Sequence, residues 1–229
     1  MTPDPDTVAL VTGASRGLGY AVASALGAAG ATVIGMARTV GGLEDLADAI
    51  EAAGGPGPVL APLSITDEGG LARLCLAIHQ RWGRLDLVVH AAAHAAPLTP
   101  AHHIAAKDFD ASVEVNLRGM QRLIRMVAPL LEAAPAGVFV QVADDRAGRP
   151  FWGSYGATKA AADALAASWA RETERIGPRV LLFRPEPMPT ALRARFYPAE
   201  NRDGLSPCAV EAARLLAELA DVAALQRIP

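Results

Sequence analysis

The amino-acid sequence predicts an α/β fold in three layers, with a doubly wound parallel sheet of six to seven strands between two layers of helices. Short β-branched apolar runs alternate with longer stretches of helical spacing along the chain, which is the order of strand–helix–strand units. The strand candidates are also apolar at nearly every position, as in Leu87–Val89. Strands of that kind are buried on both faces, which a parallel sheet between helices requires.

Six segments are predicted as strands, because each is short and rich in Val, Ile and Leu. In chain order they are Val8–Val11, Thr32–Ile34, Val59–Leu63, Leu87–Val89, Val138–Val142 and Val180–Phe183. The stretches between them space apolar residues by three and four, which predicts helices. The helices are Leu18–Ala29, Leu43–Ala53, Glu68–Trp82, Phe109–Leu131 and Ser154–Ile176, with Cys208–Ala220 as one more.

The length of 229 residues predicts a single domain over 1–229, since one core grows to about 250 residues before chains divide. Residues 1–6 form a short acidic tail without the basic and apolar parts of a signal peptide. The piece Arg184–Pro207 holds five prolines and follows the last predicted strand. We therefore expect 185–207 to be a mobile loop or lid on the substrate side.

Composition excludes several classes of function. With 21 basic and 24 acidic side chains the net charge is −3, which gives no electrostatic basis for nucleic-acid binding. The two cysteines make no disulfide framework, and no Cys/His group has metal-site spacing. No stretch is both long and apolar enough to cross a membrane. We expect a cytoplasmic protein without a metal, a nucleic-acid partner or a membrane span.

Three glycines follow the first predicted strand and precede an Ala-rich helix. Glycines let the backbone approach a pyrophosphate closely, and a helix N-terminus offers it free N–H groups. The position between a strand and a helix is the context that this motif needs. We expect the dinucleotide to bind Gly13, Ser15, Arg16, Gly17, Leu18 and Gly19.

The second predicted strand leads into Arg38 and not into an acidic residue. Sites specific for NAD place Asp or Glu there for the ribose 2′-hydroxyl. Arg38 instead offers donors for a 2′-phosphate, and Arg16 is placed to close over the same group. The sequence therefore favours NADP(H) over NAD(H).

Tyr155 and Lys159 are four residues apart in a predicted helix, so they lie on one face. A nearby ammonium stabilises a phenolate and lowers the pKa of the tyrosine. Such a tyrosine donates a proton to a carbonyl oxygen or removes one from an alcohol.

Taken together, these motifs resemble the classical short-chain dehydrogenase/reductase family, which has a Rossmann-like fold, from about Val8 to Thr190. Tyr155 and Lys159 match its catalytic pair, in which the lysine also binds the nicotinamide ribose. Asn116 matches a helix asparagine that supports a proton-relay water. The resemblance further places five residues at the cofactor: Ser64 near the adenine, Ala91 and Ala92 beneath the cofactor, and Pro185 and Thr190 near the nicotinamide.

Three departures from the family pattern accompany this resemblance. The family's Asn-Asn-Ala-Gly is His90-Ala91-Ala92-Ala93 here, and we expect His90 to be structural. Ser64 replaces an aspartate that meets the adenine. Glu186 replaces a glycine, where it would strain the turn or bring a carboxylate to the nicotinamide.

The fourth departure concerns catalysis, because the family's catalytic serine is missing. Asp144 is the best candidate for its position, with Ala143 and Asp145 as alternatives. An ionised Asp144 would repel a developing alkoxide and raise the pKa of Tyr155, whereas a protonated one would donate a hydrogen bond. As a third possibility, Asp144 or Asp145 pairs with Arg146 or Arg149 and only lines the pocket.

The resemblance implies an NADP(H)-dependent oxidoreductase that transfers hydride between the nicotinamide and a carbonyl or alcohol substrate, with Tyr155 as acid/base. The alternatives are a nucleotide-binding regulatory or partner subunit with little redox turnover, and a lyase or isomerase that uses Asp144. Ligands of this fold bind beyond the carboxyl ends of the strands. Candidates for the substrate side are His94, Phe151, Trp152, Phe196 and Tyr197.

Small residues on Phe109–Leu131 and Ser154–Ile176 match the helices that pair in dimers of the resembling family. The family's tetramer contact uses a seventh strand, which residues 225–229 shorten or omit. We therefore expect a homodimer, with a tetramer as the alternative.

Overall fold

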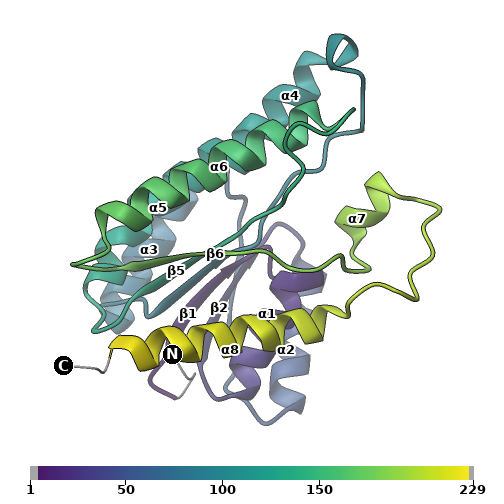
Figure 1. The fold of residues 1–229 in the computed structure, drawn as a ribbon. Helices are drawn as coiled ribbons and strands as arrows, with labels where there is room; N and C mark the ends of the chain where they lie inside the picture. The colour runs from purple at the N-terminus through teal and green to yellow at the C-terminus, as the bar shows by residue number, and fades with distance from the viewer. Residues whose placement is uncertain (1–4, 227–229) are drawn as a thin grey trace.

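The computed structural model describes residues 5–226, with side chains as far as 221. Six parallel strands form one sheet in the order β3-β2-β1-β4-β5-β6, which confirms the predicted doubly wound topology (Figure 1). The chain winds outward from β1 to β3 and then from β4 to β6, so the direction switches between β1 and β4. The strands are β1 (Val8–Thr12), β2 (Thr32–Ala37), β3 (Val59–Pro62), β4 (Leu87–His90), β5 (Val138–Val142) and β6 (Arg179–Phe183).

Helices cover both faces of the sheet, as a parallel sheet requires (Figure 1). One layer consists of α1 (Gly17–Ala28), α2 (Val40–Ala52) and α8 (Cys208–Gln226). The other consists of α3 (Glu68–Trp82), α5 (Gly119–Glu132) and α6 (Gly153–Glu172), with α4 (Ala106–Ser112) at one end. The short helix α7 (Ala191–Phe196) lies beyond the carboxyl ends of the strands.

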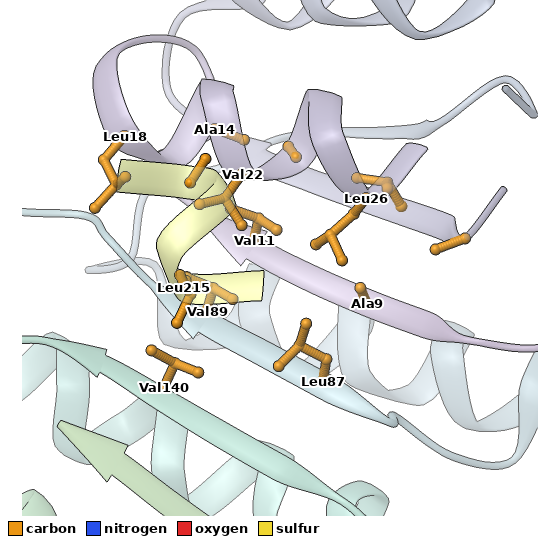
Figure 2. Close-up of a cluster of buried hydrophobic side chains, with 14 of the residues drawn as sticks. Ala9, Val11, Ala14, Leu18, Val22, Leu26, Leu87, Val89, Val140 and Leu215 are labelled. Atoms are coloured by element: carbon orange, nitrogen blue, oxygen red, sulfur yellow. The ribbon is translucent and has the colours of Figure 1, made fainter. Parts of the chain in front are cut away.

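The alternation of side chains along each strand divides the interior into two cores. In β1, Ala9 and Val11 face α1 and α8 (Figure 2), whereas Val8 and Leu10 face α3, α5 and α6. The second core includes Trp169 of α6, whose ring meets Phe139 edge-on at 5.2 Å. Each large apolar side chain contributes about 1.5–3 kcal/mol on burial. Both faces are buried, which explains strands that are apolar throughout.

Several predicted boundaries were wrong. The second strand continues past Ile34 to Ala37, because Gly35 and Met36 are also buried in the sheet. The predicted helix Ser154–Ile176 ends at Glu172, where the hydroxyl of Thr173 donates to the Trp169 carbonyl at 2.9 Å. The last helix was predicted to end at Ala220, but it runs on to Gln226. The prediction about a seventh strand concerns residues 225–229, of which 227–229 lie outside the described part.

The predicted helix Phe109–Leu131 is three segments. It comprises α4, a π-helix η2 (Val113–Arg118) and α5. A π-helical turn inserts one extra residue and commonly marks a functional position. Here it contains the buried Asn116.

The segment predicted as irregular, Arg184–Pro207, contains α7. Thr190 caps that helix, since its Oγ1 accepts a hydrogen bond of 3.1 Å from the Arg193 N–H. This helix of six residues was not predicted, because the segment around it is rich in proline.

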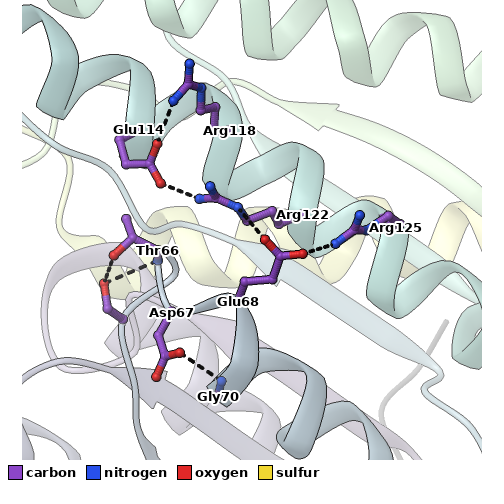
Figure 3. Close-up of polar contacts among 9 residues, drawn as sticks. Thr66, Asp67, Glu68, Gly70, Glu114, Arg118, Arg122 and Arg125 are labelled. Carbon is purple, nitrogen blue, oxygen red and sulfur yellow. Dashed lines mark hydrogen bonds and ion pairs between the residues drawn. The ribbon is translucent and has the colours of Figure 1, made fainter.

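Ion pairs join α3 to the η2–α5 segment on the surface (Figure 3). Glu68 pairs with Arg122 and Arg125, and Glu114 pairs with Arg118 and Arg122. Arg118, Arg125 and Glu68 are more than half accessible, so the exposed pairs contribute little, on the order of 0–1 kcal/mol each. The contacts orient two helices that the core already holds.

Candidate active site

A cavity of about 690 Å³ opens at the carboxyl ends of the strands, around the switch between β1 and β4. All fourteen residues that the sequence predicts for the cofactor line it. They are Gly13, Ser15, Arg16, Gly17, Leu18, Gly19, Arg38, Ser64, Ala91, Ala92, Tyr155, Lys159, Pro185 and Thr190. Residues spread over 178 positions of the chain therefore meet at one site.

The glycine turn is held close to the end of β4. Gly13 has a φ of 71°, and a side-chain carbon there would lie 2.9 Å from the Ala92 nitrogen. Gly17 has a φ of 60°, and its open face lies against the methyl group of Thr190. Only glycine fits such a backbone without strain. The turn, β4 and the start of α7 therefore enclose the cavity together.

His90 lies beneath this turn and is almost fully buried. Its Nδ1 shares a hydrogen bond of 2.8 Å with the Thr12 hydroxyl, which also accepts one from the Ala92 N–H. Burial, reinforced by the charge of Lys159, lowers the pKa of His90 to about 3. A neutral imidazole therefore connects β1 to β4.

Arg16 and Arg38 are exposed at the rim of the cavity, at the start of α1 and the end of β2. Arg38 is followed by Thr39, so no carboxylate stands at this position. Ser64, after β3, bonds to the Thr66 hydroxyl at 2.8 Å. The arrangement offers two guanidinium groups to an anion at this end.

Tyr155 and Lys159 lie one turn apart on α6 and are 4% and 6% exposed. The Lys159 Nζ donates a hydrogen bond of 2.6 Å to the Val142 carbonyl. Burial and the neighbouring Asp144 raise the pKa of Tyr155 well above its usual value. Burial lowers the pKa of Lys159, although Asp163 and Asp144 act in the opposite direction.

Of the three candidates for the missing serine, Asp144 faces Tyr155. Its Oδ2 accepts a hydrogen bond of 2.9 Å from the Tyr155 hydroxyl, and its Oδ1 lies 3.1 Å from Arg146 Nε. Asp145 is 86% exposed and lies 3.9 Å from Arg149, and Ala143 is buried directly after β5. Asp144 thus both pairs with arginine and contacts the tyrosine.

Asn116 is not on the cavity wall. Its Oδ1 accepts the His94 N–H at 2.7 Å, and its Nδ2 donates to the His94 carbonyl and the Thr158 hydroxyl. The side chain joins the loop after β4 to α6 behind Lys159.

Aromatic rings cover Tyr155 from the side of α7. The ring centroid of Phe196 is 5.0 Å from that of Tyr155 and 4.4 Å from that of Trp152. Tyr197 and His94 also line the cavity, as predicted. Phe151, which was also predicted, does not line the cavity, and it is 57% exposed.

Arg146, which the sequence offered as a partner of Asp144, also lies 5.3 Å from the Trp152 ring. Two further arginines of the cavity were not predicted: Arg193, which donates to Glu200 at 2.6 Å, and Arg195. The alternation Arg193-Ala194-Arg195 was the available signal.

Glu186 does not strain its turn, because Phe151 is the only non-glycine residue with positive φ among residues 5–226. The Glu186 N–H donates at 3.0 Å to the buried carboxylate of Glu211, which also accepts from Ser206 and Arg214. Both ends of the predicted lid are therefore attached to α8.

In residues 5–226 no group of three His, Cys, Asp or Glu side chains is placed to hold a metal ion. Over the same range, no helix is long and apolar enough to cross a membrane.

A doubly wound sheet, a glycine turn after β1 and a Tyr–Lys pair at one cavity are together typical of α/β dehydrogenases. The family model described as short chain dehydrogenase matches residues 7–201, and the chain belongs to this family. It is 31% identical to a short chain dehydrogenase structure from Pseudomonas syringae, with a TM-score of 0.88 over 93% of this chain and 90% of that one.

Two further similarities carry cofactor names. A short chain dehydrogenase structure from Escherichia coli CFT073 complexed with NADPH is 29% identical, with a TM-score of 0.85 over 94% and 91% of the chains. The "Probable NADP-dependent dehydrogenase" of Haemophilus influenzae is 32% identical over 158 residues, 67% of this chain. The chain spans 60% and 63% of the length of two curated relatives that it matches.

Proposed function

We propose that the chain is an NADP(H)-dependent oxidoreductase that transfers hydride between a nicotinamide and a carbonyl or alcohol substrate. One observation carries the proposal: Tyr155 and Lys159 meet at the wall of the cavity that the glycine turn closes at its other end. A proton donor and a cation beside a dinucleotide-type turn are what a carbonyl reduction needs.

The residues at the rim of the cavity fit NADP(H), which carries a 2′-phosphate, better than NAD(H), which lacks one. Arg16 and Arg38 stand at the cavity rim, and Thr39 follows where an acid would hold a free ribose hydroxyl. The names of the NADP-dependent relative and of the NADPH complex support the same choice.

The nicotinamide would supply or accept the hydride at its C4 when bound. Tyr155 would donate its hydroxyl proton to the carbonyl oxygen, which the ammonium of Lys159 helps to stabilise as charge develops. The Tyr155 hydroxyl now points at Asp144, so it must rotate toward the substrate. Arg146 offsets part of the Asp144 charge that would otherwise repel the forming alkoxide.

One observation favours the alternative, a nucleotide-binding protein with little turnover. The Tyr155 hydroxyl is occupied by a carboxylate, and the ring is buried under Phe196. A lyase or isomerase with Asp144 as base is a further alternative, since that carboxylate lies at the cavity wall.

We further propose that α7 and its flanking loops act as a lid, since Phe196 of α7 packs against the ring of Tyr155 at the wall of the cavity. For the assembly we propose a homodimer through α5 and α6, with a tetramer as the alternative. Light scattering after size exclusion tests the assembly.

A cytoplasmic location is supported by two free cysteines, Cys75 and Cys208.

Two measurements on the wild-type protein separate these functions. NADPH should raise the melting temperature more than NADH, and oxidation of NADPH should follow with at least one member of a panel of aldehydes and ketones. A shift without oxidation would favour the non-redox alternatives. No shift with either nucleotide would contradict every function that uses this cavity.

A further inference from the structure

A carboxyl group outside the proposed proton-transfer pair lies one helical turn beyond Lys159. Asp163 and Lys159 are four apart on α6, so both side chains project from the same face. Asp163 is partly buried, where an unpaired carboxylate is unfavourable. The proposed reaction assigns it no task, and its position needs another explanation.

The partners of Asp163 are at the end of β5. Its Oδ1 accepts a hydrogen bond of 3.2 Å from Gln141 Nε2, and its carboxyl also accepts the backbone N–H of Asp144. Between these two residues, the Val142 carbonyl accepts from Lys159. The last residues of β5 thus contact Lys159 and Asp163 together.

Gln141 is completely buried, and its Oε1 has no hydrogen-bond partner. A buried amide with one unsatisfied oxygen is unfavourable by about 1–3 kcal/mol. The amide nitrogen is nevertheless directed at Asp163, which indicates that this contact helps to position the Asp163 carboxylate.

We propose that Asp163 is a positioning residue, whose carboxylate is the counter-charge to the buried ammonium of Lys159 one turn earlier on α6 and, through Gln141, holds the end of β5 against Lys159. Any effect of Asp163 on catalysis rests on the proposed function. Its effect on the charge of Lys159 is independent of that function.

The charges around Lys159 set the sign of the effect. Burial lowers the pKa of Lys159, and the carboxylates of Asp163 and Asp144 oppose this. Burial raises the pKa of Asp163, and the charge of Lys159 lowers it. Removing the Asp163 charge therefore lowers the pKa of Lys159 further. The titratable and charged groups that face this pair are Tyr155 on α6, Asp144 after β5, His90 on β4 and Arg184 after β6.

The sequence offers a direct readout, because it contains two lysines, Lys107 and Lys159. Lys107 is exposed on α4 and serves as the internal control. In protein labelled with [¹³Cε]lysine, each signal reports one titration. Asp163→Asn should lower the pKa of Lys159 by about one to three units and leave that of Lys107 unchanged. Asp163→Glu, which keeps the charge, should return the value toward wild type.

An unchanged Lys159 pKa in folded Asp163→Asn would overturn the proposal and leave Asp163 a merely structural residue, even if the melting temperature falls. Should that variant not fold, the wild-type titration decides. As Asp163 takes up its proton at acid pH, the Lys159 signal should shift a second time, and a single inflection would contradict the proposal. Neither measurement uses substrate, so failure of the oxidoreductase function is recognised separately. If that function holds, the basic limb of the kcat profile should move to lower pH in Asp163→Asn while KM changes little.

Discussion

The hydroxyl of Tyr155 donates a hydrogen bond of 2.9 Å to Oδ2 of Asp144. The candidate acid therefore meets the carboxylate that we predicted at the position of the family's serine. Together with burial, this carboxylate raises the pKa of Tyr155. A tyrosine that keeps its proton suits protonation of a carbonyl oxygen and opposes removal of a proton from an alcohol. The relationship between these two residues predicts a site biased toward reduction.

Asp144→Ser should relieve that bias. Without the carboxylate the pKa of Tyr155 falls by about one unit or more, so alcohol oxidation near pH 8 should increase at least about tenfold. The pH profile of kcat in the oxidative direction measures this. Asp145→Ser is the matched control, because Asp145 is exposed and does not contact Tyr155. If both variants have the wild-type profile, Asp144 only lines the pocket.

Arg38→Ala should weaken NADPH binding roughly 10- to 100-fold, because one charge-assisted contact to a phosphate is lost. NADH has no 2′-phosphate, so its affinity should change little. Titration calorimetry with both nucleotides measures the two affinities. Arg171→Ala, an exposed arginine near the end of α6, is the control. An equal loss for NADPH and NADH would place the 2′-phosphate elsewhere.

The buried His90 makes stability depend on pH. Its pKa is about 3 in the folded chain and about 6.5 when unfolded, so below pH 6.5 the unfolded chain binds the extra proton. The free energy of unfolding should therefore decrease as the pH falls. Protonation of His90 alone should lower it by about 2 kcal/mol between neutral pH and pH 5. His90→Asn should lose less stability than wild type between pH 7 and pH 5. Urea unfolding at the two pH values tests this, and equal losses would speak against a neutral buried His90.

Glu211 should hold the lid more firmly than its neighbour on the same helix. Glu211→Gln breaks a buried ion pair with Arg214 and weakens the contacts to Glu186 and Ser206, which predicts a loss of about 1–3 kcal/mol. Glu218→Gln removes an accessible partner of the same arginine and should lose less than about 1 kcal/mol. Thermal unfolding compares the two. Equal losses of stability in the two variants would mean that the burial of Glu211 does not strengthen its contacts.

Much of the fold followed from the sequence because strands buried on both faces are apolar at each position. The segment Val138–Val142 was predicted to the residue. Strand ends were less certain, since Gly35 and Met36 are no stronger strand formers than loop residues and only the sheet around them makes them strand. The π-helix around Asn116 is six residues long, too short to show a spacing distinct from that of the helices on either side.

The site was predictable where chemistry depends on local spacing. Tyr155 and Lys159 are fixed by one helix turn, and the glycine turn by its position between a strand and a helix. Contacts between distant segments were not predictable. The Asp163–Gln141 bond and the cover of Phe196 over Tyr155 depend on how α6, β5 and α7 meet in space.

The most direct test compares wild type and Tyr155→Phe in one experiment, with NADPH binding and carbonyl-dependent NADPH oxidation measured side by side. The variant removes only the hydroxyl, and general acid catalysis contributes about a hundredfold or more. We predict that turnover falls at least about a hundredfold while NADPH binding stays within about threefold of wild type. Undiminished turnover in Tyr155→Phe would contradict the assignment of Tyr155 as the acid/base of this protein.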